Sequence, residues 1–162
     1  LGREKDQSRL RYLIEEFLRE QLEEKRLSEE YYEAVNPQKI AEFLQSECAY
    51  RMWRAERAGK LYREQPFVLG IDAKELSGRF EGDAPEGETL LIQGIIDVFW
   101  MEEDGIVLLD YKTDKVDSTD ALWDRYEAQM DYYSRALTQI TGRPVKERIL
   151  YSSRLGQEAG RP

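Results

Sequence analysis

Two apolar runs separated by four turn-forming residues constrain the fold of this chain more than any other feature. The runs cover residues 90–101 and 106–111, and the segment 102–105 between them reads EEDG. Short apolar runs joined by such a segment are typical of paired antiparallel strands. The sequence therefore predicts a β-hairpin, and counting outward from a four-residue turn places Asp97 directly opposite Asp110.

Helical periodicity predicts helices on both sides of this hairpin. Apolar residues recur at helical spacing from residue 8 to about residue 27. Asn36-Pro37 is typical of the start of a second helix, which should continue past Met52-Trp53 and end at Gly59. A third long helix should begin at Asp117 or Ser118 and end at Thr141-Gly142.

Two further segments have strand patterns, residues 61–69 before the hairpin and residues 145–151 after the third helix. Residues 78–88 contain three glycines, one proline and four acids, which predicts a loop. The order of helices, three strands, a helix and a strand predicts an α/β fold, a mixed sheet flanked by helices.

The chain length is that of one compact domain. Within it we expect a helical segment over residues 1–60 that packs on a core over residues 61–155. Residues 156–162 should form a frayed tail.

The predicted hairpin brings together two acids that ordinary strand pairing disfavours. Directly opposed side chains have Cβ atoms about 4.5–5.5 Å apart, and like charges there are destabilising. Asp110 follows an apolar run that indicates a strand buried on both faces, and Lys112 projects on the same face as Asp110. Two carboxylates beside an ammonium group predict a site for Mg2+ or Mn2+. The alternative is a pair of strand-end acids that share Lys112 as an ion-pair partner.

The third helix carries two polar side chains within its apolar stripe. Gln129 lies three positions after Tyr126 and four before Tyr133, so all three face the same side. A buried amide needs hydrogen-bond partners. Either the backbone satisfies Gln129, or Gln129 and Tyr133 reach the metal site or the DNA backbone.

The charge of the chain is unusual for a domain that holds nucleic acid by itself. Its 33 acidic and 24 basic residues give a net charge of -9, whereas such domains usually have a basic face. Two interpretations remain. The chain has a carboxylate-rich site that needs a divalent metal, or other parts of a larger protein bind the DNA for this domain.

Cysteine, histidine and apolar content exclude several other classes. A lone Cys48 and the absence of His exclude an internal disulfide and a Cys/His zinc site, which fits a reducing, cytoplasmic setting. No apolar run approaches the roughly 20 residues that span a bilayer, so no membrane partner is expected.

Taken together, the polar motifs resemble those of a known family. Gly94-Ile95-Ile96-Asp97, then Asp110-Tyr111-Lys112-Thr113, then Gln129 with Tyr133 resemble the D…D-x-K…Q-x-x-x-Y series of RecB-like nucleases in the PD-(D/E)XK superfamily. The similarity covers about residues 35–155. It includes Glu64-Gln65-Pro66-Phe67, as in the nuclease domains of bacterial AddAB-type helicase-nucleases.

This resemblance implies a restriction-endonuclease-like α-β-β-β-α-β core and a DNA exonuclease that processes double-strand ends for recombination and repair. The implied partners are DNA, an ATP-driven helicase region upstream in the same polypeptide, and a second subunit. The implied cofactor is Mg2+ or Mn2+. The residues implied are Asp97, Asp110 and Tyr111 as metal ligands, with Lys112, Glu64, Gln129 and Tyr133 completing the catalytic site.

One departure from the family pattern affects the expected activity. RecB-like nucleases usually carry a metal-binding His on a preceding helix, and this chain contains none. A fragment that begins downstream of that His would explain this and would have an incomplete metal site. Two other functions stay open. One is a stand-alone RecB-like exonuclease, although many of these hold an iron-sulfur cluster through several cysteines. The other is an inactive nuclease fold that serves as an acidic interaction module.

Overall fold

The computed structural model describes residues 2–76 and 87–162, so most of the loop predicted over residues 78–88 lies outside the described residues. The helices are α1 (Gly2–Glu23), α2 (Glu29–Ala34), α3 (Pro37–Leu44), α4 (Glu47–Arg57), α5 (Ala73–Leu76) and α6 (Thr119–Thr141). The strands are β1 (Leu61–Asp72), β2 (Thr89–Met101), β3 (Ile106–Lys112), β4 (Val145–Ser152) and β5 (Gln157–Arg161).

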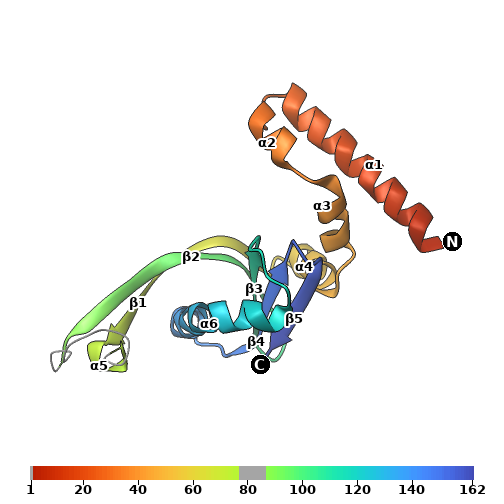
Figure 1. Cartoon of the computed structure of the whole chain (residues 1–162). Coiled ribbons are helices and arrows are strands. Elements are labelled where there is room, and N and C mark those ends of the chain that lie inside the picture. Colours follow the sequence, from red (N-terminus) through yellow and green to blue (C-terminus); the bar gives the residue numbers. More distant parts are fainter. Residues whose placement is uncertain (1, 77–86) are drawn as a thin grey trace.

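These strands form one sheet in the order β1-β2-β3-β4-β5 (Figure 1). β3 and β4 are parallel, and the other neighbours are antiparallel. The parallel pair is connected through α6, as a parallel connection requires a crossover. The predicted mixed sheet with flanking helices is therefore confirmed.

The β2–β3 hairpin has the predicted register. Met101 pairs with Ile106, and the ladder continues to the pair formed by Val98 and Leu109. Asp97 and Asp110 are the next residues on their strands. The turn is closed by the Glu102 amide, which donates to the Gly105 carbonyl at 2.8 Å.

Two apolar cores lie on opposite faces of the sheet. α6 covers one face, where Leu122, Met130 and Leu137 pack against residues of β1, β2 and β3. α4 covers the other, where Cys48 and Ala55 pack against β2, β3 and β4. β3 is buried on both faces from Ile106 to Asp110, as its unbroken apolar run predicted.

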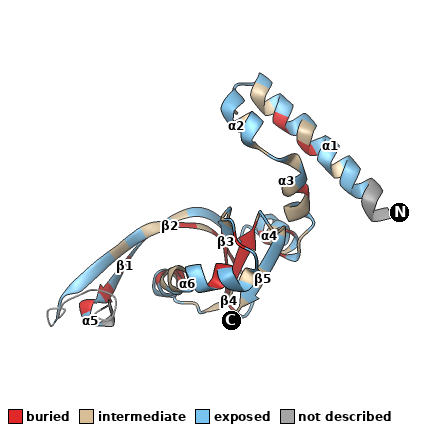
Figure 2. Cartoon of the chain, in the orientation of Figure 1, coloured by how far each residue is buried: buried red, intermediate tan, exposed pale blue. Residues whose placement is uncertain are grey.

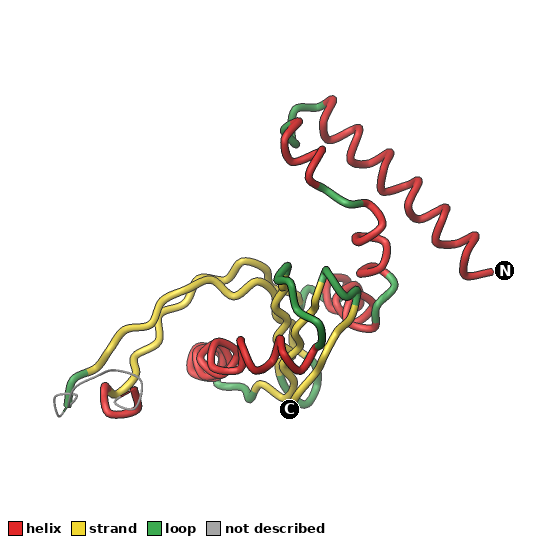
Figure 3. Tube along the Cα trace, viewed as in Figure 1, coloured by secondary structure: helices red, strands yellow, loops and turns green. Residues whose placement is uncertain are grey.

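The β1–β2 ribbon extends well beyond the part of the sheet that α6 covers (Figure 3). Its ladder runs from the pair of Leu61 and Trp100 to the pair of Asp72 and Thr89, so β1 is longer than the segment 61–69 predicted from the sequence. Much of the ribbon and most of α1 and α2 are exposed (Figure 2). The buried residues of β2 lie between Ile96 and Trp100, near β3, whereas those of β1 are Phe67, Leu69 and Ile71, in the half toward α5.

The prediction of one helix from Asn36 to Gly59 is wrong. The Asn36 side chain caps α3 as expected, but the chain leaves the helix at Gln45 and Ser46 caps a new helix, α4, by accepting from the Ala49 amide at 3.2 Å. α1 packs on α3 in a separate small cluster, and the short α2 was not predicted. Of these helices, α4 makes the main contact with the sheet.

The prediction of a frayed tail over residues 156–162 is also wrong. Residues 157–161 form β5, which pairs antiparallel with β4. The reversal uses Gly156, whose φ of 64° suits a residue without Cβ and whose amide donates to the Ser152 carbonyl at 2.9 Å. The Trp123 indole of α6 donates to the Ala159 carbonyl at 3.1 Å, which fixes β5 against the helix.

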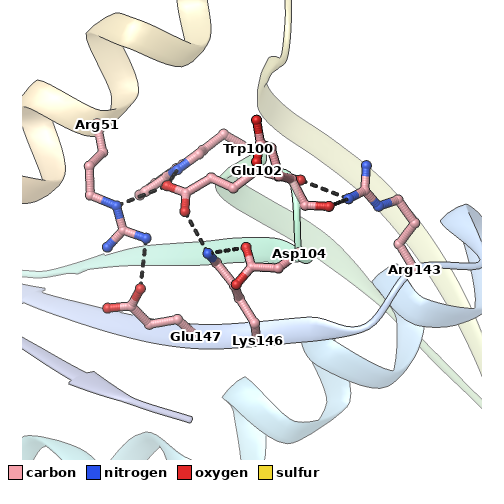
Figure 4. Close-up of polar contacts among 8 residues, drawn as sticks. Arg51, Trp100, Glu102, Asp104, Arg143, Lys146 and Glu147 are labelled. Carbon is pink, nitrogen blue, oxygen red and sulfur yellow. Dashed lines mark hydrogen bonds and ion pairs between the residues drawn. The ribbon is translucent and has the colours of Figure 1, made fainter.

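A polar network ties α4 to the β2–β3 turn (Figure 4). Arg51 of α4 donates to Glu102 at 2.9 Å and contacts Glu147 of β4 at 2.7 Å. Glu102 also pairs with Lys146 at 2.7 Å and accepts from the Trp100 indole at 2.9 Å. The network joins the turn to α4 and to β4, so it stabilises the register of the β2–β3 hairpin, whose strands carry Asp97 and Asp110.

None of the described helices combines enough length with enough apolar character to cross a bilayer.

Candidate active site

The alternation of side chains along β2 reverses at Asp97. Ile96 and Phe99 both pack in the core beneath α6, whereas Val98 packs in the core beneath α4. In an uninterrupted strand, Ile96 and Val98 would share a face. Beyond this switch Asp97 alternates with Val98 and so lies on the same face as Phe99, the face that α6 covers.

β1 has a matching irregularity at Glu64. The ladder pairs Arg63 with Val98 and Gln65 with Ile96, which leaves Glu64 opposite Asp97 without a backbone pair. Glu64 has a φ of 50°, in the left-handed region that non-glycine residues rarely adopt. Both strands of the ribbon therefore change faces at the same position, and this change presents Asp97 to α6.

Asp110 is the buried acid of the site. It is 2% exposed, and its Oδ2 lies 2.5 Å from the Lys112 Nζ. This oxygen accepts no hydrogen bond of regular geometry from any described residue, so the contact is an ion pair. Burial raises the pKa of Asp110 and the charge of Asp97 adds to the effect, while Lys112 partly opposes it. Among the described residues, Lys112 is thus the only group that offsets the cost of burying the Asp110 charge.

A chain of hydrogen bonds connects Lys112 to α6. The Lys112 Nζ donates to the Gln129 Oε1 at 2.8 Å, and the Gln129 Nε2 donates to the Tyr133 hydroxyl at 2.7 Å. Gln129 is thus bonded to side chains of the candidate site through both its amide oxygen and its amide nitrogen. Burial raises the pKa of Tyr133, and the charges of Asp110 and Asp97 act in the same direction. Five of the predicted residues therefore meet on one face of the sheet: Asp97, Asp110, Lys112, Gln129 and Tyr133.

Tyr111 takes part through its backbone. Its amide donates to the Asp97 Oδ2 at 3.2 Å. Its side chain points to the opposite face, where the hydroxyl lies 3.6 Å from the Met52 Sδ and the ring meets Phe43 edge-on. Tyr111 could therefore serve as a metal ligand only through its backbone carbonyl.

Glu64 does not join the two aspartates as a third clustered acid. Its side chain is exposed, on the strand next to Asp97. Within residues 6–74 and 87–162, no three Asp, Glu, Cys or His side chains come together as a metal site. The described residues thus offer a pair of carboxylates.

Tyr126 belongs to the same cluster, and the sequence motifs did not indicate it. The Lys112 Nζ lies 3.9 Å from the centroid of the Tyr126 ring, and the Tyr126 hydroxyl donates to the Asp114 Oδ2 at 2.8 Å. The available signal was its position, one helical turn before Gln129 in the stripe that faces the core.

The donor set fits a hard divalent cation. Asp97 and Asp110 provide carboxylate oxygens, the ligands that Mg2+ and Mn2+ prefer. Among the described residues, none donates a hydrogen bond to the buried Asp110 Oδ2. Burial and the charge of Asp97 both raise the pKa of Asp110, and a bound cation would stabilise the charged carboxylate.

Two comparisons with known proteins bear on the family of this chain. The sequence profile of the PD-(D/E)XK nuclease superfamily matches residues 2–159. A protein from Clostridium botulinum (strain Loch Maree / Type A3), named as one subunit of an ATP-dependent helicase/nuclease, is 40% identical over 138 residues, which cover 85% of this chain and 11% of that protein. The protein of the same name from Lachnoclostridium phytofermentans is 38% identical, with 82% of this chain and 12% of that protein covered. The one from Clostridium novyi is 39% identical, with 80% and 10% covered. The chain therefore spans about a tenth of the length of these relatives.

Proposed function

This chain belongs to the PD-(D/E)XK nuclease superfamily, and we propose that it is the divalent-metal-dependent DNA exonuclease domain of a helicase-nuclease. Nucleases of this superfamily use divalent metals. The names of the relatives support the helicase-nuclease assignment. Because the chain spans only about a tenth of those relatives, the proposal also includes an attached helicase region, a role in processing double-strand DNA ends, and a second subunit.

The observation that carries the proposal is the contact between Asp110 and Lys112. A buried carboxylate that is paired with one lysine and lies beside a second acid lowers the stability of the fold. Such a cost is typical of residues that are kept for a function. Strongly perturbed acids cluster at functional sites. The burial of Asp110 next to Asp97 therefore favours a reactive site over two ordinary strand-end acids.

Asp97, Asp110 and the backbone carbonyl of Tyr111 would hold Mg2+ or Mn2+. When bound, the ion supplies Lewis-acid polarisation of a phosphoryl oxygen and lowers the pKa of bound water. The two aspartates are held in place by the hairpin register and by the Tyr111 amide, which donates to Asp97.

Lys112 would stabilise the negative charge that develops on the phosphoryl group. Its ammonium has three N–H donors. One of them is donated to Gln129, and the ammonium also forms an ion pair with Asp110. Preorganised donors of this kind commonly contribute about 100- to 1,000-fold to a rate.

Gln129 and Tyr133 would orient Lys112. Because the Gln129 Nε2 donates to the Tyr133 hydroxyl, the amide is fixed with its oxygen toward Lys112. The Tyr133 ring is itself fixed by an edge-on contact with Phe67 of β1, with ring centroids 5.3 Å apart. This chain of contacts connects the ribbon, α6 and the end of β3.

The negative charge of the domain supports a division of roles. With a net charge of -9, the chain gains little from general attraction to phosphate groups. We propose that the helicase region delivers DNA to this site. Glu64, exposed beside Asp97, would act at the edge of the site toward substrate.

The test uses the full-length helicase-nuclease and linear DNA with Mg2+. Asp110→Asn and Lys112→Ala should each lower digestion at least about 100-fold, because each removes a group that acts at the reacting phosphate. Matched controls are Asp124→Asn and Lys115→Ala, which alter exposed residues near the same elements and should stay within about twofold of wild type. DNA-stimulated ATP hydrolysis reports on folding. Undiminished digestion by both site variants would contradict the proposal, and a wild-type protein that cleaves no DNA would favour an inactive interaction module.

A further inference from the structure

The Lys112 ammonium has a contact on α6 that the nuclease motifs do not account for. Its Nζ lies 3.9 Å from the centre of the Tyr126 ring, and its side chain is 11% exposed. A cation over an aromatic face is attracted by the ring quadrupole, more strongly when water is largely excluded. Tyr126 therefore contributes directly to where the ammonium lies.

The Tyr126 ring is held in turn by Asp114. The Tyr126 hydroxyl donates to the Asp114 Oδ2 at 2.8 Å, and Arg125 donates to the Asp114 Oδ1 at the same distance. The hydrogen bond from Tyr126 lowers the pKa of Asp114, and the contact with Arg125 adds to this effect. Asp114 is thus a charged acceptor with both oxygens engaged.

These contacts form a ring of interactions that includes Lys112, Tyr126 and Asp114. Asp114 lies two residues after Lys112, and Tyr126 lies three residues before Gln129 on α6. The ammonium is therefore contacted from β3 by Asp110 and from α6 by Gln129 and Tyr126. The segment after β3 is fastened to the same turns of α6.

We propose that Tyr126 is a positioning residue for Lys112 and that Asp114 holds the Tyr126 ring in place for this purpose. The inference rests on the proposed nuclease function. Lys112 can stabilise a developing charge only if its ammonium is held close to the phosphoryl oxygen, and small misplacements of such groups lower the rate. Tyr126 restricts the ammonium on the side that neither Asp110 nor Gln129 occupies.

The competing explanation is that Tyr126 and Asp114 only fasten the segment after β3 to α6. A fastening role and a positioning role both predict a loss of activity on substitution. They differ in whether the loss depends on Lys112. A double-mutant cycle with Lys112 separates them.

The experiment measures cleavage of linear DNA at saturating Mg2+ by the full-length protein. Tyr126→Leu removes the ring, whereas Tyr126→Phe keeps the ring and removes its bond to Asp114. Asp114→Asn weakens the same bond from the other side. Each is made in the wild-type and Lys112→Ala backgrounds. Tyr132→Leu, at a half-buried tyrosine of α6 that packs on the same core, is the matched control.

We expect Tyr126→Leu to lower kcat about tenfold with KM for DNA within about twofold, the size expected from losing a partly desolvated cation–ring contact. Tyr126→Phe and Asp114→Asn should each lower kcat about threefold, because the ring remains but is less restrained. In the Lys112→Ala background, all three changes should have no further effect beyond about twofold. Tyr132→Leu should leave kcat within about twofold.

Two results would overturn the inference. One is a kcat for Tyr126→Leu equal to that of wild type. The other is the same fold loss in both backgrounds, which would show a fastening role. If Tyr126→Leu lowers the melting temperature substantially, Tyr126→Phe and Asp114→Asn take its place, and the inference fails if either lowers kcat by the same factor with and without Lys112. A Lys112→Ala variant that cleaves normally would instead refute the proposed function itself, so the two failures are distinguishable.

Discussion

Glu64 has a left-handed backbone conformation in the middle of β1, which predicts that glycine is preferred over alanine at this position. Its φ is 50°. For a residue with a Cβ this conformation costs about 1–2 kcal/mol, whereas glycine adopts it without that cost. Glycine also loses more backbone entropy on folding, which offsets roughly 0.5–1 kcal/mol of the gain. Glu64→Gly should therefore be more stable than Glu64→Ala by about 0.5–1 kcal/mol.

Val68 provides the matched control on the same strand. It is exposed and pairs with Gln93 in the regular part of the ladder, and it has no positive φ. At such a position the usual order holds, so Val68→Ala should be more stable than Val68→Gly by about 0.5–1 kcal/mol. The sign of the difference between alanine and glycine should reverse between the two positions.

Urea unfolding of the four variants measures these differences, and thermal melting gives a second reading. For a chain of this size, 1 kcal/mol corresponds to roughly 2–4 °C. Alanine equal to or better than glycine at both positions would refute the left-handed conformation of Glu64. The same result would mean that β1 has no irregularity opposite Asp97, where the side chains of β2 change faces.

Three further predictions concern residues that hold the site in place. Gly94→Ala should lower DNA cleavage several-fold in the full-length protein, because the new Cβ would lie 3.0 Å from the Phe67 ring, which packs on Tyr133; unchanged cleavage would contradict this. Arg51→Ala should lower the free energy of unfolding by about 2 kcal/mol, seen in urea, because it leaves two partly buried carboxylates without their guanidinium. Burial raises the pKa of Glu102, but Arg51, Lys146 and Trp100 outweigh it and lower the pKa to about 2. Glu102 therefore stabilises the fold above its unfolded pKa of about 4.3, and this stabilisation is lost as pH falls toward 2. Glu102→Gln should show a weaker loss of stability over that range, and an unchanged pH profile would contradict the assignment.

The sequence predicted the elements that depend on local chemistry. The four-residue turn that ends at Gly105, the cap at Asn36 and the stop at Gly142 were all predicted, because each depends on neighbouring residues alone. Gly142 ends α6 with a φ of 70°, as a left-handed glycine cap does. The hairpin register followed from the turn length, and the observed ladder ends at the pair of Val98 and Leu109, one residue before Asp97 and Asp110.

The sequence did not predict features that depend on tertiary contacts. Helical spacing continues across Ser46, so the break between α3 and α4 was hidden by an unbroken apolar pattern. β5 has almost no apolar residues, and it forms because β4 offers an open edge and Trp123 a donor. The contact of Tyr126 with Lys112 depends on how α6 crosses the sheet, which periodicity cannot give.

The claim that Asp97 and Asp110 form a divalent-cation site is tested most directly by locating Mn2+ in crystals through its anomalous scattering. We predict an ion bonded to both carboxylates in the wild-type protein and no ion at that position in Asp97→Ala. Mn2+ bound elsewhere under conditions that support DNA cleavage, or a signal at this position that persists in Asp97→Ala, would contradict it.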